Sequence, residues 1–138
     1  MAAGHPAGLP DLFLDRSLGR RQVPDLLRAA GLRVRTLSEV YGVPRDEAVA
    51  DVEWLELAGS RGWVVLMKDE RIRYRAAERE MLLTYGVRAF CLTGGNLLAA
   101  TMAGHFLAAI EQIAAACEES GPFLYAVSVQ GIRRIELR

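Results

Sequence analysis

Short apolar runs alternate with longer segments of helical periodicity, and this alternation constrains the fold more than any other feature of the chain. The four runs that we predict as strands are residues 12–14, 32–37, 63–67 and 87–92. The four segments that we predict as helices are residues 23–30, 46–60, 71–85 and 96–119. Alternation of this kind predicts an α/β fold, in which a parallel sheet is covered by helices on both faces.

The two ends of the chain depart from this alternation. Residues 123–129 and 132–137 flank the turn Gln130-Gly131 and predict a terminal β-hairpin. Residues 1–9 are small, rich in Gly and Pro and uncharged apart from His5, so we interpret them as a flexible tail without the features of a signal peptide. Residues 10–138 are then expected to form a single domain.

Charge and composition exclude several classes of protein. The 17 basic and 17 acidic side chains cancel, which excludes a strongly basic nucleic-acid coat but allows a local basic patch. No apolar run approaches the roughly 20 residues of a membrane-spanning helix, so we expect no membrane association. Cys91 and Cys117 lie far apart in apolar stretches, which favours a reducing, cytoplasmic location.

Three aspartates occupy positions that suit a metal site. Asp15 and Asp69 follow the predicted strands 12–14 and 63–67, and ligands of parallel sheets bind at the carboxyl ends of strands. Asp51 lies three residues before Trp54, on the apolar face of its predicted helix, whereas Glu53 falls on the solvated face. Carboxylates that cluster need a counter-charge, and Mg²⁺ prefers such oxygen ligands and could promote phosphodiester hydrolysis.

Each aspartate also has a structural alternative. Asp15 and Asp69 could cap the helices that follow them, and Asp51 could pair with an arginine. For one aspartate alone this alternative is the simpler one, but three at one edge of a sheet favour a metal site.

Basic residues lie beside these aspartates. Four cations, Lys68, Arg71, Arg73 and Arg75, lie around Tyr74 in the sequence, and Arg16 directly follows Asp15. Such a patch could hold the backbone of a single-stranded nucleic acid. The alternative is an exposed helix start in which the arginines pair with acidic residues such as Glu78.

Three segments resemble the PIN-like domains, most closely the branch found in VapC-type toxins. They are Leu-Phe-Leu-Asp at 12–15, Asp-Val-Glu-Trp-Leu at 51–55, and Trp-Val-Val-Leu-Met-Lys-Asp-Glu-Arg-Ile at 63–72. The resemblance runs from about residue 12 to residue 96. It implies a ribonuclease that depends on Mg²⁺ or Mn²⁺, acts on RNA, is inhibited by a cognate antitoxin protein and often forms a homodimer.

The family's acids fall on Asp15, Asp51 and Asp69 as catalytic metal ligands. Where many members carry a fourth acid, this chain offers Thr93 and Asn96, and we expect Asn96 to support the metal or its water. The missing acid favours one alternative, a catalytically degenerate PIN-like module that binds a protein or RNA. A phosphotransfer signalling domain fits less well, because Arg16 stands where an acidic pair is needed.

Overall fold

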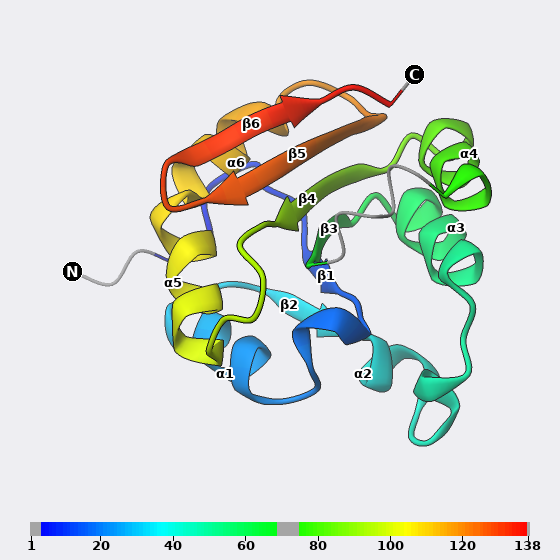
Figure 1. The fold of residues 1–138 in the computed structure, drawn as a ribbon, viewed down its shortest axis with the longest axis horizontal. Coiled ribbons are helices and arrows are strands. Elements are labelled where there is room, and N and C mark those ends of the chain that lie inside the picture. The colour runs from blue at the N-terminus through cyan, green and yellow to red at the C-terminus, as the bar shows by residue number, and fades with distance from the viewer. Residues whose placement is uncertain (1–3, 69–74, 138) are drawn as a thin grey trace.

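The strands form one mixed sheet in a computed structural model that describes residues 4–68 and 75–137 (Figure 1). The strand order is β2-β1-β3-β4-β5-β6; the first five strands are parallel, and β6 is antiparallel to β5. The strands are β1 (Leu12–Leu14), β2 (Val34–Thr36), β3 (Val64–Met67), β4 (Arg88–Leu92), β5 (Phe123–Ser128) and β6 (Gly131–Ile135). The predicted parallel sheet and terminal hairpin are therefore confirmed.

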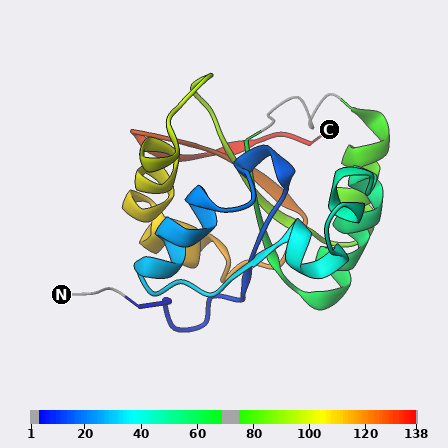
Figure 2. The ribbon, with the colours of Figure 1, turned by 90° about the horizontal axis from the view of Figure 1, so that it is seen from below.

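Helices cover both faces of this sheet, as predicted (Figure 2). The helices on one face are α1 (Gln22–Ala29), α5 (Ala99–Ala108) and α6 (Ile110–Ala116). Those on the other face are α2 (Leu37–Tyr41), α3 (Asp51–Arg61) and α4 (Ala76–Thr84). Two short 3₁₀ helices, η1 (Arg16–Leu18) and η2 (Arg45–Glu47), precede α1 and α3.

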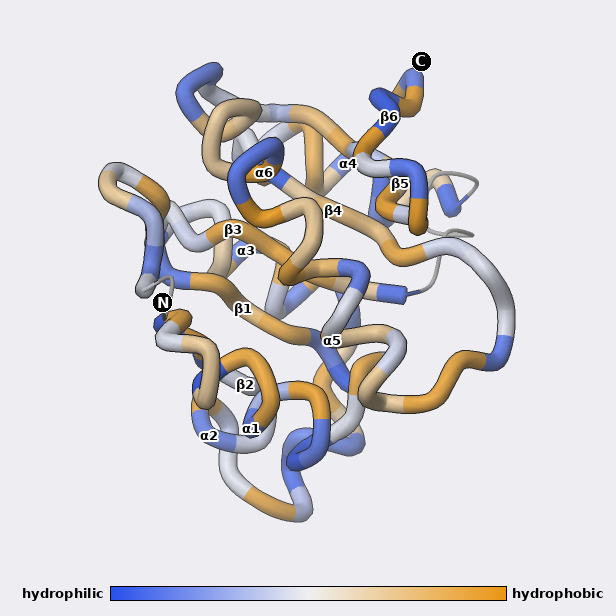
Figure 3. Tube along the Cα trace, turned by 90° about the vertical axis from the view of Figure 1, so that its left-hand side faces the viewer, coloured by the Kyte–Doolittle hydropathy of each residue, from blue (hydrophilic) through white to orange (hydrophobic). Residues whose placement is uncertain are grey.

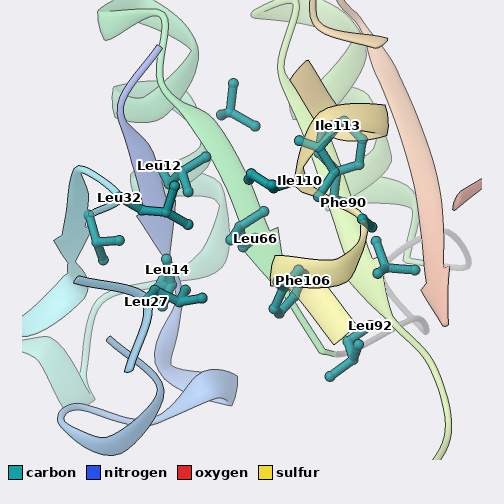
Figure 4. Close-up of a cluster of buried hydrophobic side chains, with 14 of the residues drawn as sticks. Leu12, Leu14, Leu27, Leu32, Leu66, Phe90, Leu92, Phe106, Ile110 and Ile113 are labelled. Atoms are coloured by element: carbon teal, nitrogen blue, oxygen red, sulfur yellow. The ribbon is translucent and has the colours of Figure 1, made fainter. Parts of the chain in front are cut away.

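Each face of the sheet has its own apolar core, because successive side chains of a strand point to opposite sides. Leu12 and Leu14 pack with α1, α5 and α6 (Figure 4), whereas Phe13 lies on the opposite side. The ring centroid of Phe13 is 5.6 Å from that of Trp54 and 5.5 Å from that of Trp63. The apolar strands β1, β3 and β4 run through the middle of the molecule (Figure 3), and nearly all of their residues are buried.

The sheet topology brings the ends of β1 and β3 together. The chain leaves β1 for β2 on one side and returns to β3 on the other, so β1 and β3 flank the point where the strand order reverses. Crevices at such a point are the usual ligand sites of open α/β sheets. The backbone N–H of Asp15 donates to the carbonyl of Leu66, 3.4 Å away. The chain therefore leaves both strands at the same edge.

Several element boundaries differ from the prediction; within the described residues the helix expected at 71–85, for example, is α4, Ala76–Thr84. The helix expected at 46–60 begins at Asp51; Asp46 is not its N-cap but a buried residue of η2. The helix expected at 96–119 is two helices that meet at Ala109. The strand expected at 32–37 ends at Thr36, because Thr36 and Glu39 form a capping box that starts α2.

The segment before β1 contacts the rest of the chain. His5 Nε2 donates to the carbonyl of Leu9 at 2.8 Å, and His5 Nδ1 accepts from the backbone N–H of Arg33 at 3.0 Å. The tail at 1–9 and the domain at 10–138 stay predictions. Across residues 4–68 and 75–137, no helix has the length and apolar character needed to cross a membrane.

Candidate functional site

Asp15 lies at the carboxyl end of β1 and is only 7% exposed. Its Oδ1 accepts hydrogen bonds from the backbone N–H of Ser17, at 3.1 Å, and from the Ser17 hydroxyl. That hydroxyl also accepts from the backbone N–H of Lys68, at 2.9 Å. Ser17 therefore connects the aspartate after β1 to the first residue after β3.

Burial dominates the electrostatics of Asp15. The pKa of the carboxyl is raised from 3.8 to about 7: burial is the largest cause, the Ser17 hydrogen bonds lower the pKa, the negative charge of Asp51 raises it and Arg16 lowers it. The raised pKa is the net result with the Ser17 hydrogen bonds in place, so these bonds do not offset the cost of ionising Asp15 in the folded protein. A buried carboxyl with such a pKa in a cleft is a candidate functional group.

Asp51 begins α3 and belongs to the same electrostatic cluster. Its Oδ1 accepts from the indole Nε1 of Trp54 at 3.0 Å and from Arg16 Nη1 at 3.2 Å. Its Oδ2 is 3.6 Å from Arg75 Nη1. The side chain is 27% exposed, whereas Glu53 is 47% exposed and pairs with Arg45. Helical spacing therefore predicted correctly that Asp51 is the more buried of the two acids and Glu53 the more exposed.

Arg16 connects Asp51 to the loop that precedes α3. Besides Asp51, its guanidinium donates to the carbonyl of Asp46 at 3.0 Å and to that of Val49. We predicted Arg16 to bind RNA, and that role stays a prediction. In this structure the guanidinium makes internal hydrogen bonds, so its visible effect is to hold the 46–51 segment against η1.

The structure brings only part of the predicted site into view. Asp69, Arg71 and Arg73 lie outside the described residues. Asn96 is exposed in the loop between β4 and α5, and within the described chain no hydrogen bond joins it to Asp15 or Asp51. Lys68 is half-buried, with its backbone N–H on Ser17.

The described residues provide two of the three predicted metal ligands. Within 4–68 and 75–137, no group of three His, Cys, Asp or Glu side chains forms a complete site. Asp15 and Asp51 nevertheless fit a divalent cation: both present hard oxygen atoms, and a bound cation would relieve the repulsion between their charges. Asp69 follows Lys68 directly and is the predicted third ligand.

Comparison with known proteins shows the family of this chain. A family model described as "PIN like domain" matches residues 10–94. The chain belongs to the PIN-like domain family. A protein of Mycobacterium tuberculosis (strain ATCC 25618 / H37Rv) named "Putative ribonuclease VapC45" is 40% identical over 129 residues, which cover 94% of each chain. No solved structure gives a significant match.

Two of the aspartates also make the purely structural contacts that the sequence allowed in this PIN-like domain. Asp15 caps η1, and Asp51 pairs with Arg16. Neither contact excludes a metal, because both cap donors reach the same oxygen of Asp15 and the arginine pair of Asp51 is partly exposed. The pKa of Asp15 stays raised with the cap bonds in place, so ionising this carboxyl opposes folding. We therefore favour Asp15 as a metal ligand over Asp15 as a helix cap alone.

The sequence reasoning did not single out Ser17, and it did not connect Arg20 with the carboxylates of Asp46 and Glu47. Ser17, two residues after Asp15, has the spacing of an Asx-type turn, and this signal could have identified it. Arg20 binds the buried Asp46 through two hydrogen bonds of 2.9 Å, and it reaches Glu47 at 2.8 Å. Arg20 and Asp46 are 26 residues apart, so no local pattern connects them.

Arg16→Lys should destabilise the PIN-like domain by about 1–2 kcal/mol, because an ammonium group cannot reach three acceptors that a guanidinium spans. The matched control is Arg45→Lys, since Arg45 makes a surface ion pair of 3.2 Å with Glu53. Its cost should stay below about 0.5 kcal/mol. Urea denaturation of both variants measures the difference, and equal costs would show that Arg16 does not hold the loop.

Proposed function

We propose that this PIN-like domain is a metal-dependent endoribonuclease and the toxin of a type II toxin–antitoxin pair. The observation that carries the proposal is the buried Asp15, coupled to Asp51 at the sheet's switch point. The 40% identity to a protein named as a ribonuclease of the VapC group supports the same reaction. RNA is then the substrate, and a cognate antitoxin protein is the partner.

The proposed roles follow from the positions of the residues. Asp15 and Asp51, with Asp69, would hold Mg²⁺ or Mn²⁺, which when bound supplies a Lewis acid for a phosphoryl oxygen and lowers the pKa of the attacking water. Ser17 keeps Asp15 in one orientation, and Trp54 does the same for Asp51. Lys68, Arg71 and Arg73 would contact the RNA backbone, and Asn96 would support the metal or its water.

Assembly and location are proposals of the same kind. A homodimer is expected from the resemblance to VapC-type toxins. Cys91 and Cys117 are both buried, and neither forms a disulfide. Cysteines without disulfides are the form expected in a reducing cytoplasm.

A second candidate is a PIN-like module that binds RNA or a protein without cleaving RNA. The pairing of Asp51 with Arg16, and of the same carboxylate with Arg75, favours it, since two cations already neutralise one of the acids. Calorimetry separates the candidates: the nuclease should bind Mn²⁺, whereas the degenerate module should not.

Asp51→Asn should lower metal-dependent RNA cleavage by at least about 100-fold, because it removes a carboxylate from the predicted metal site. The measurement is the cleavage rate of a radiolabelled RNA with Mg²⁺ or Mn²⁺ and with excess chelator. Glu53→Gln is the control, since Glu53 lies on the same helix and is exposed. Wild-type protein that cuts no RNA with either metal, or cuts equally well with chelator, would refute the proposed reaction.

A further inference from the structure

A cleft of about 190 Å³ extends the candidate site from Asp15 towards the end of β2. Its lining includes Asp15, Arg16, Arg20, Ser38, Asp46 and Glu47. We refer to it as the β2-edge cleft. Because Asp15 forms one wall, any group bound there lies next to the proposed point of cleavage. The volume corresponds to about six water molecules, which is room for one small ring system rather than for a folded element.

The charge of the lining argues against a phosphate in this cleft. Three carboxyl groups, those of Asp15, Asp46 and Glu47, outnumber the two guanidinium groups of Arg16 and Arg20. Both guanidinium groups also already donate to protein oxygens. A neutral group that donates hydrogen bonds fits this lining better than an anion does.

The polar groups of the cleft are held in fixed positions. Asp46 is 4% exposed, and both of its oxygens accept from Arg20. Those bonds occupy the edge of the Arg20 guanidinium, and a guanidinium held at its edge can offer its flat face to an unstacked base. Glu47 has a 68% exposed side chain with one oxygen on Arg20, so its carboxylate is an accessible acceptor at the rim.

We propose that the β2-edge cleft is a subsite for one nucleobase next to the scissile phosphate, selective for bases with an exocyclic amino group. Adenine, cytosine and guanine present such a donor to the Glu47 carboxylate. Uracil has no amino group, and its single N3–H lies between two carbonyl oxygens that the carboxylate repels. Single-stranded RNA is commonly recognised in this way, through splayed bases that stack and form edge hydrogen bonds. The inference rests on the proposed ribonuclease function, because it takes RNA as the ligand.

Oligonucleotide binding without metal tests the subsite separately from cleavage. The probes are the tetranucleotides of adenosine, cytidine and uridine, titrated against the full chain in chelator and followed by NMR. We expect the uridine probe to bind about tenfold more weakly than the cytidine probe, which is the size expected for one hydrogen bond to a charged group. Glu47→Gln should reduce this difference to about threefold or less.

Two further variants make the test specific. Glu53→Gln removes a nearby exposed carboxylate that is not among the residues lining the cleft, so it should leave the tenfold difference unchanged. Ser38→Leu places a larger side chain in the lining and should weaken the adenosine and cytidine probes alike. Circular dichroism verifies that each variant is folded.

The outcomes distinguish this inference from the proposed function. Equal binding of the three probes, or a difference that survives Glu47→Gln, overturns the subsite even if the protein cleaves RNA. Discrimination that depends on Glu47 without any cleavage supports the subsite and refutes the nuclease. Binding of an arginine-containing peptide in the cleft, with no discrimination among the probes, would assign the cleft to a protein partner instead.

Discussion

Asp15→Asn should reduce metal-dependent RNA cleavage about 1,000-fold while making the folded protein more stable at neutral pH. The loss follows because a metal ligand contributes several kcal/mol to the transition state, and each 1.36 kcal/mol is a factor of ten. The gain follows because burial raises the pKa of Asp15 from 3.8 to about 7, so ionising this carboxyl opposes folding. We expect a stabilisation of about 1–3 kcal/mol at pH 8 without metal.

The sign of the pH dependence follows from the same pKa. Because the folded-state value is the higher one, wild-type protein loses stability from this group as pH rises from 3.8 to about 7, and the loss is complete above that. The asparagine variant lacks this loss, so its advantage in urea denaturation should be larger at pH 8 than at pH 5. An advantage that is absent or larger at pH 5 would contradict the assigned burial of Asp15.

The wild-type protein should also lose metal affinity below pH 7. A cation that binds Asp15 must then displace a proton, and the apparent affinity falls by up to about tenfold per pH unit. Calorimetry with Mn²⁺ at pH 6 and pH 8 measures this loss of affinity. The Asp51→Asn variant should also bind Mn²⁺ more weakly at pH 6 than at pH 8, because it leaves Asp15 in place.

The arrangement of the sheet was predictable because it depends on local patterns. Residues 12–14 and 63–67 are apolar throughout, as expected for strands covered on both faces, and β1 and β3 are neighbours in the sheet. The side of α3 on which Asp51 lies was equally predictable, since helical spacing alone places it over Trp54. The position of Asp51 on α3 depends on residues less than one helical turn apart, and the pairing of β1 with β3 follows from general rules of parallel sheets.

Long-range polar contacts were not predictable in this way. The sequence indicated that Asp46 starts a helix, but the buried Asp46 is paired with Arg20, which lies 26 residues earlier in the chain, before β2 and α2. The internal bonds of Arg16 have the same origin, since Asp51 is 35 residues away. A pattern of residue types cannot distinguish an arginine that binds RNA from one that holds a loop, because both need the same guanidinium.

Phe13→Ala should produce the largest loss of stability, about 3–5 kcal/mol, because it opens a cavity in a buried central strand. The Phe13 ring is fully buried between Trp54 and Trp63. Trp54 also donates to Asp51, so a shift of its indole would reach the candidate metal site. Phe13→Leu, which keeps most of the volume, should cost about 1.5 kcal/mol or less. Guanidinium denaturation compares the two variants. Similar costs would contradict the cavity argument and would assign the loss to the ring contacts with Trp54 and Trp63, which both variants lack. Mn²⁺ calorimetry of both variants shows whether the loss of Phe13 also reaches Asp51.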